Sequence, residues 1–388
     1  MDFRFSPEQE KLRQEVRAFL DEELRKGTFE PMMDSWVEGY APSFSQKLGQ
    51  KGWIGYTWPR EYGGHEKSYL DRLVITEELL MAGAPVAFHW MGDRQIGPSI
   101  IAYGTEEQKR EFLPRIIRGE VSFAIGMSEP EAGSDLAGLK SRTVEQEDGF
   151  ILNGQKVWTG GAHKTDYLYL VARTDPNVPK HRGITEFIVD MKSPGITVRP
   201  IIDMTNTHHL NEVYFDNVKV PRSGLIGQKN RGWYQIAAQL DYERSGPERL
   251  VSNYLLYKEL LAWVKEQGLG ANPQVRCQLA EREVELEVGR WLVYRVTWAL
   301  SRKIVPNYEA SLAKVYGTAY QQRLAQTAVE VTGLYGQLLE GSRWARLRGM
   351  AARASMMCRA YSIMGGTSEV LRNIVALRGL GLASQAGG

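Results

Sequence analysis

Short β-type runs occupy one internal stretch of the chain, and helical periodicity lies on both sides of it. Gly, Pro and Asp punctuate these runs, as in a small barrel or sandwich. The runs cover residues 150–157, 167–172, 186–190 and 213–216. The sequence therefore predicts an α+β fold in three parts: an all-α N-terminal domain at 1–120, a central β-barrel or sandwich domain at 121–230, and a C-terminal four-helix bundle at 231–388.

Local chemistry predicts several element boundaries. Ser6 and Thr105 are hydroxyl N-caps expected to begin helices. The pair Asn153-Gly154 is a strong hairpin-turn signal. Apolar spacing predicts helices over 70–84, 96–103, 250–261, 274–302, 309–334 and 343–364.

Composition and charge describe an ordinary soluble globular protein. Of 388 residues, 43% are hydrophobic and 24% charged, and the net charge of +2 gives no general attraction to nucleic acid or anionic membrane. The two cysteines, Cys277 and Cys358, are far apart and lack metal-site spacing. No secretory signal pattern and no run of about 18 apolar residues is present. We therefore expect a cytoplasmic protein with no membrane segment and no bound metal.

The run at 126–138, Gly-Met-Ser-Glu-Pro-Glu-Ala-Gly-Ser-Asp-Leu-Ala-Gly, follows an apolar stretch that predicts a buried strand. Gly133 permits a tight turn or the close approach of a ligand. Turns of this composition are common, yet the order Ser-Glu-Pro-x-Ala-Gly-Ser-Asp resembles the first signature of the acyl-CoA dehydrogenase family. The resemblance implies that Met127 and Ser128 face a flavin and that Ser134 faces the CoA portion of a substrate.

A second motif, Gln-Lys-Val-Trp-Thr-Gly-Gly, covers residues 155–161. Trp158 is either a core residue or a cover for one face of a planar heterocycle. The segment resembles the family region in which an aromatic ring lies over the FAD isoalloxazine. Family members usually carry a hydroxyl at the position of Gly160, which can bond the flavin N5. In this chain, Thr159 or a backbone N–H would have to donate the hydrogen bond to the flavin N5.

The third motif, Leu-Asp-Tyr-Glu-Arg at 240–244, stands on a predicted helix. Such charge clusters usually mark a solvated helix face, but Asp241 and Arg244 are three residues apart and share one face. The motif resembles the family helix whose Asp and Arg contact substrate. In the branch that includes isovaleryl-CoA dehydrogenases, the residue before this Arg is the glutamate base, here Glu243. The common base position, in the C-terminal segment, is occupied by Gly365.

Pro247 and Gly246 follow this motif closely. Proline cannot donate a hydrogen bond to the carbonyl four residues earlier, that of Glu243, and its ring crowds that carbonyl. We expect a kink or helix disruption there, which would widen the acyl pocket for a branched, cyclic or bulky acyl group.

The resemblance implies further FAD contacts. Arg276 would reach the pyrophosphate of a neighbouring subunit's FAD, and Gly333 belongs to a glycine turn near the cofactor. Thr367 and Glu369 would also hold FAD, whereas Glu330 replaces a usual glutamine. Because all these residues occur in one chain, we expect a homo-oligomer, tetramer or dimer; a hetero-oligomer stays open.

The implied activity is FAD-dependent α,β-dehydrogenation of an acyl-CoA to the 2-enoyl-CoA, in lipid catabolism. Glu243 would abstract the α-proton, flavin N5 would take the β-hydride, and electron-transfer flavoprotein would accept the electrons. Two segments, 161–163 and 173–176, look closest to bacterial members, some of which act on steroid side chains. Two alternatives stay open: a flavin monooxygenase or oxidase on this fold, and a DNA-binding non-enzymatic flavoprotein, suggested by five arginines and no acid within 343–359.

Overall fold

The computed structural model describes residues 4–236 and 246–382. Contacts between backbones divide the chain into two compact units. The first unit consists of residues 1–36, 68–84 and 244–388, and the second of 37–67 and 85–243. The expected domains are continuous stretches of chain that meet near residues 120 and 230, whereas each contact-based unit combines separate stretches. The expected boundaries therefore remain a prediction.

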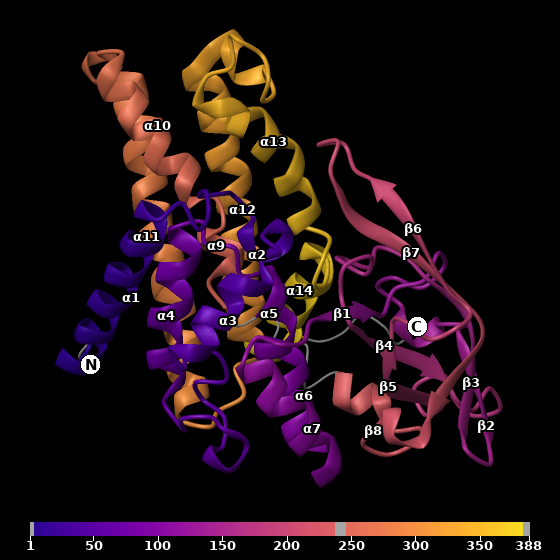
Figure 1. Ribbon diagram of the computed structural model, residues 1–388. Helices are drawn as coiled ribbons and strands as arrows, with labels where there is room; N and C mark the ends of the chain where they lie inside the picture. Colours follow the sequence, from indigo (N-terminus) through magenta and orange to yellow (C-terminus); the bar gives the residue numbers. More distant parts are fainter. Residues whose placement is uncertain (1–3, 237–245, 383–388) are drawn as a thin grey trace. The chain divides into compact units, whose positions relative to one another are not determined.

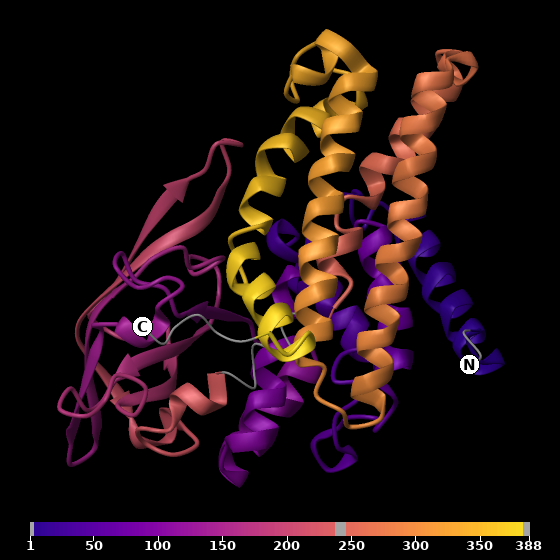
Figure 2. The same ribbon diagram turned by 180° about the vertical axis from the view of Figure 1, so that it is seen from behind.

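The first unit is built from helices, and α11 and α12 lie side by side in both views (Figures 1 and 2). Its helices are α1 (Pro7–Arg25), α4 (Tyr69–Met81), α9 (Glu248–Val251), α10 (Tyr254–Glu266), α11 (Pro273–Ser301), α12 (Asn307–Thr332), α13 (Met350–Tyr361) and α14 (Ser368–Ile374), and α2 (Ser35–Glu38) stands where the first unit gives way to the second. Ser6 caps α1, where its hydroxyl accepts from Gln9 N at 3.3 Å, as predicted.

A buried charge network joins three of these helices. Glu77 on α4 is 1% exposed and accepts hydrogen bonds from Arg290 Nε at 3.0 Å and Tyr294 Oη at 3.1 Å, both on α11. Arg13 on α1 donates to the neighbouring Glu78 at 2.6 Å. Buried charges are tolerated because each has a partner of opposite sign, so this network fixes the packing of α1, α4 and α11.

Two of the expected bundle helices differ from the structure. The helix expected over 250–261 is interrupted between α9 and α10, where Ser252 bonds back to the carbonyl of Glu248 and Asn253 donates to Cys358 Sγ at 3.0 Å. The helix expected over 343–364 begins only at Met350. Gly349, with φ of 75°, has a left-handed backbone that cannot continue a helix.

The expected helix disruption concerns Gly246 and Pro247. Both residues lie outside any helix, and α9 begins at Glu248. Pro247 O instead accepts from Leu250 N at 2.8 Å, which starts the new helix. Glu243 itself lies outside the described residues.

The second unit contains a mixed sheet with helices from the N-terminal third of the chain. The sheet order is β6-β7-β3-β2-β4-β5-β8, and β1 pairs in parallel with β4. Its strands are β1 (Phe123–Gly126), β2 (Arg142–Gln146), β3 (Gly149–Lys156), β4 (Tyr167–Arg173), β5 (Ile184–Asp190), β6 (Ile196–Ile202), β7 (His208–Pro221) and β8 (Leu225–Ile226). Its α-helices include α3 (Pro42–Gln50), α5 (Ala87–Met91), α6 (Gly97–Tyr103) and α7 (Glu106–Ile117), and residues 232–236 are helical as well. β6 and β7 form a long hairpin that extends beyond the other strands (Figure 1).

The hairpin turn expected at Asn153-Gly154 is wrong. Both residues lie inside β3, and the β2–β3 turn is at 147–148. Gly154 stands at a register shift against β7, and a β-carbon there would be 2.4 Å from Ser141 Oγ. The glycine is therefore needed for the close approach of Ser141 and not for a turn.

Candidate functional site

The first two sequence motifs meet at one end of the sheet in the second unit. The loop after β1 and the segment after β3 are joined by a backbone hydrogen bond from Val157 N to Ser128 O at 3.0 Å. Lys156 Nζ adds a second link by donating to Met127 O at 2.9 Å. The structure thus brings Met127, Ser128 and Trp158, predicted separately from sequence, to the same edge.

A buried ion pair holds this junction. Lys156 Nζ lies 2.7 Å from Glu129 Oε1, and the two side chains are 0% and 6% exposed. Glu129 also accepts from the backbone N–H of Ser141 at 3.0 Å. Burial lowers the pKa of Lys156 to about 8, against the opposing effect of Glu129. Burial alone would raise the pKa of Glu129, but the charge and hydrogen bond of Lys156 bring it below its usual value.

Sequence reasoning missed the function of Lys156 and Glu129, although both stand within the quoted motifs. A signal was available: Phe150, Leu152 and Lys156 share one face of β3, since side chains alternate along a strand. The first two are core residues, which places the ammonium group in the interior as well.

Trp158 follows directly and is not a core residue. Its side chain is 60% exposed, while Val157 and Thr159 on either side are 8% and 1% exposed. Its φ is 60°, a left-handed value that is a steric outlier for a bulky residue. Such strain persists where surrounding structure imposes it, and often at ligand sites. The core alternative is therefore wrong, and the indole offers an open apolar face.

The next two residues are held against β7. Thr159 N donates to Asn211 O at 3.0 Å, and Asn211 Nδ2 donates back to Thr159 O at 2.9 Å. The Thr159 hydroxyl is buried and has no hydrogen-bond partner among the residues that the structure describes. Gly160 faces His209, whose Nε2 would lie 2.5 Å from a β-carbon at position 160. A serine or threonine there would displace the imidazole.

Three histidines gather beside this segment. The rings of His163 and His208 stack at 3.9 Å, and His208 Nε2 lies 2.8 Å from Asn211 Oδ1. Burial, and then the neighbouring His163, lower the pKa of His209 to about 4, so its imidazole is neutral at physiological pH. Among residues 4–236 and 246–382, no cluster of three His, Cys, Asp or Glu side chains is arranged to hold a metal ion.

Ser134 lies in the exposed part of the first loop. Its neighbours Gly133 and Asp135 are exposed as well, and Asp135 forms an ion pair with Lys180 at 2.9 Å. The hydroxyl of Ser134 is therefore accessible for a ligand contact.

The remaining predicted cofactor residues belong to the first unit. Arg276 is exposed in the first turn of α11, and Gly333, with φ of 60°, ends α12. Thr367 caps α14 by accepting from Val370 N at 3.2 Å, and the exposed Glu369 lies 3.8 Å from Arg372. The substrate residues Asp241 and Arg244, like Glu243, lie outside the described residues.

Glu330, expected to replace a cofactor-binding glutamine, has protein partners. Its carboxylate accepts from Gln278 Nε2 at 2.9 Å and from Gln326 Nε2 at 2.8 Å. The acid therefore joins α11 to α12.

The arginine-rich run also has local partners. Arg348 lies 3.8 Å from Glu259, and the guanidinium groups of Arg343 and Arg346 lie over the rings of Trp344 and Tyr335. These three arginines are therefore engaged in contacts at the protein surface.

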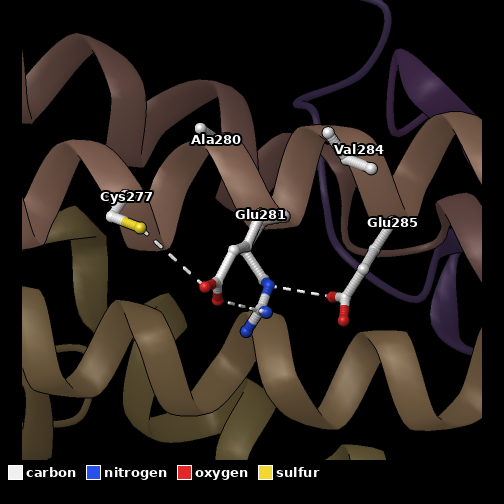
Figure 3. A pocket seen from close by; sticks show the side chains of 6 residues that line it. Cys277, Ala280, Glu281, Val284 and Glu285 are labelled. Atoms are coloured by element: carbon white, nitrogen blue, oxygen red, sulfur yellow. Dashed lines mark hydrogen bonds and ion pairs between the residues drawn. The ribbon is translucent and has the colours of Figure 1, made fainter.

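An open hollow lies on α11, one residue beyond Arg276 (Figure 3). Its lining residues are Cys277, Ala280, Glu281, Arg282, Val284 and Glu285. The charged groups pair with each other, with Arg282 lying 3.2 Å from Glu281 and 2.9 Å from Glu285. The hollow therefore presents no unpaired charge to a ligand.

Comparisons with known proteins agree with this architecture. Three domain models match in order: acyl-CoA dehydrogenase N-terminal domain at residues 6–120, middle domain at 124–218 and C-terminal domain at 230–380. The chain belongs to the acyl-CoA dehydrogenase family, and the predicted family and fold class are confirmed. It is an oxidoreductase that acts on acyl-CoA. Within the described ranges, none of the helices has the length and apolar character needed to cross a membrane.

Several relatives are similar over nearly their whole length. Acyl-CoA dehydrogenase FadE26 of Mycobacterium tuberculosis is 34% identical, covering 98% of this chain and 99% of its own. Mitochondrial isovaleryl-CoA dehydrogenase of Pongo abelii is 29% identical, covering 95% of this chain and 88% of its own. The solved structure titled "Tcur3481-Tcur3483 steroid ACAD" is 34% identical with a TM-score of 0.89, covering 99% of this chain and 100% of that chain.

Proposed function

We propose that this protein catalyses the FAD-dependent α,β-dehydrogenation of a branched, cyclic or otherwise bulky acyl-CoA, with Glu243 as the base. The observation that carries the cofactor assignment is Trp158, an exposed indole on a left-handed backbone at the end of β3. A large aromatic side chain that is exposed and stands on a strained backbone is expected where a planar ligand covers its apolar face.

The residues around Trp158 fit the isoalloxazine of FAD. The buried Thr159 hydroxyl without a partner among the described residues can bond a polar edge of a ligand. Met127 and Ser128 are held beside it through Lys156 and Val157. We expect these residues, with Arg276, Gly333, Thr367 and Glu369, to hold the cofactor. When bound, FAD supplies the hydride acceptor for the reaction.

The assignment of the base is supported by the backbone of the C-terminal segment. Gly365 and Gly366 have φ of 67° and 93°, and Lys314 Nζ donates to Gly366 O at 2.8 Å. A side chain at position 365 would adopt a left-handed conformation, which costs roughly 1–2 kcal/mol. Position 365 is glycine and offers no carboxylate, so we assign the acceptance of the α-proton, which needs a positioned carboxylate, to Glu243. Asp241 and Arg244 would position the substrate, with Ser134 at its CoA portion.

The relatives support a bulky acyl group, since one solved homologue is titled a steroid ACAD. The start of α9 agrees with the expected disruption, because α9 begins only at Glu248, after Gly246 and Pro247. A panel of straight, branched, cyclic and steroid side-chain acyl-CoAs, added anaerobically to the FAD-loaded protein, tests this through bleaching of the flavin band. We expect the bulky thioesters to give the highest kcat/KM; a preference for short straight chains would contradict the substrate assignment.

We also infer electron-transfer flavoprotein as the electron acceptor, a homo-oligomeric assembly and a cytoplasmic location. Reduced enzyme should reoxidise slowly in air and rapidly with an electron-transfer flavoprotein. Rapid reoxidation by O₂ alone would favour an oxidase or monooxygenase. Light scattering of the purified chain should give a dimer or tetramer, and an inactive monomer would indicate a second, different subunit.

A further inference from the structure

The imidazole of His209 fills the space over Gly160. A β-carbon at position 160 would lie 2.5 Å from His209 Nε2 and 2.9 Å from Cε1, so the ring occupies the volume that a side chain at 160 would use. The backbone of His209 is fixed on the same segment, because its carbonyl accepts from Gly161 N at 2.9 Å and from Asn211 Nδ2 at 3.1 Å. Gly160 and His209 therefore form a matched pair, two residues from Trp158.

His209 differs from the two histidines beside it. His163 and His208 stack on each other, and His208 bonds Asn211. His209 is partly exposed, and neither of its ring nitrogens makes a hydrogen bond to the residues that the structure describes. Its ring nitrogens are therefore available to a ligand that lies beside Gly160.

Burial, and to a smaller extent the neighbouring charges, keep the ring neutral. Burial has the largest effect on its pKa, and His163, Lys164 and His208 lower the pKa further, while Asp203 opposes them. A neutral imidazole offers one N–H donor and one acceptor nitrogen. His209 can therefore donate a hydrogen bond without placing a positive charge against a bound molecule.

We propose that His209 is a cofactor-binding residue, whose neutral imidazole donates a hydrogen bond to the flavin ring system lying on Trp158. The glycine at position 160 makes room for it, and the imidazole takes the place of any polar side chain that could stand there. This inference rests on the proposed function, because it takes FAD as the ligand of the site.

The test uses apoprotein reconstituted with FAD, and its readouts are the dissociation constant and the absorption spectrum of bound FAD. His209→Ala should weaken FAD binding about tenfold and shift the flavin band, as expected for one lost hydrogen bond. His209→Gln, which keeps an N–H donor, should lose less. Gly160→Ser alone should impair binding, since its side chain meets the imidazole. The double variant Gly160→Ser/His209→Ala should recover binding, because the hydroxyl then has space and replaces the donor.

Two comparisons separate the outcomes. The control variant His208→Ala removes a neighbouring imidazole but leaves the contact of His209 with Gly160. If His208→Ala loses as much FAD affinity as His209→Ala, and the double variant does not recover FAD binding, the role of His209 is purely structural and the proposal is overturned. Unchanged FAD affinity and spectrum in His209→Ala would overturn it as well, while the proposed function would stand. Failure of the wild-type protein to bind FAD would instead overturn the proposed function itself.

Discussion

Lys156 donates to Glu129 across 2.7 Å, and both side chains are buried where β3 ends beside the loop that follows β1. Lys156 reaches the carbonyl of Met127 from the same ammonium group. One cation therefore holds the loop of the first motif against the segment that carries Trp158. We therefore expect the geometry of the proposed flavin site to depend on this pair.

Removing one partner of this pair tests its importance. Lys156→Met should lower the free energy of unfolding by about 3–5 kcal/mol, because it leaves Glu129 buried without its counter-charge. Urea denaturation measures the loss, and FAD affinity should fall with it. Lys140→Met, which removes an ammonium paired with the exposed Glu131, should leave both unchanged. Equal effects of the two substitutions would contradict the account.

A second prediction concerns pH and Glu186. This carboxyl on β5 is fully buried, and burial raises its pKa to about 7, although a hydrogen bond from Gln235 Nε2 at 2.6 Å opposes the shift. Since the folded pKa exceeds the unfolded value of about 4.5, the folded state binds the extra proton. The resulting stability is fully present below pH 4.5 and is lost as the pH rises to about 7, by up to about 3 kcal/mol.

Glu186→Gln removes this titration while keeping a similar shape. Its unfolding free energy, measured by denaturant at pH 5, 6, 7 and 8, should change less over that range than the wild-type value. It should also exceed the wild-type value at pH 8, where the wild-type carboxyl is charged and buried. An identical pH profile for the two proteins would show that Glu186 does not titrate in this window.

The third prediction separates stability from binding at Trp158. Trp158→Ala should weaken FAD binding by more than tenfold, because a stacked aromatic face contributes more than about 1.4 kcal/mol. The unfolding free energy should change by less than about 0.5 kcal/mol, since the indole is mostly exposed. Trp344→Ala, at another exposed tryptophan, should leave FAD affinity unaltered. A stable variant with normal FAD affinity would remove the main support for the flavin assignment.

The fold was predictable where the local pattern was long and uninterrupted. The helices expected over 274–302 and 309–334 correspond to α11 and α12 within two residues at each end. The pattern was misleading where tertiary contacts determined the backbone. Gly154 permits the close approach of Ser141, and Gly349 keeps α13 from beginning before Met350. Neither requirement is visible in neighbouring residues.

The sequence indicated the motifs of the candidate site but not the residues that hold those motifs in place. Sequence indicated Met127, Ser128 and Trp158, and the structure places them at one edge. The residues that hold that edge, Lys156 and Asn211, depend on contacts between segments distant in the chain. The contact of His209 with Gly160 joins two residues 49 positions apart, a pairing that sequence spacing does not reveal.

The most direct test of the central claim is anaerobic mixing of a bulky acyl-CoA with FAD-loaded Glu243→Gln. The amide cannot accept the α-proton, so flavin bleaching should fall by at least a thousandfold, within the range of general base contributions of about 10²–10⁴. The spectrum and affinity of bound FAD should be retained, and Glu15→Gln, on the exposed face of α1, should bleach like the wild type. Bleaching of Glu243→Gln at the wild-type rate would contradict the assignment of the base.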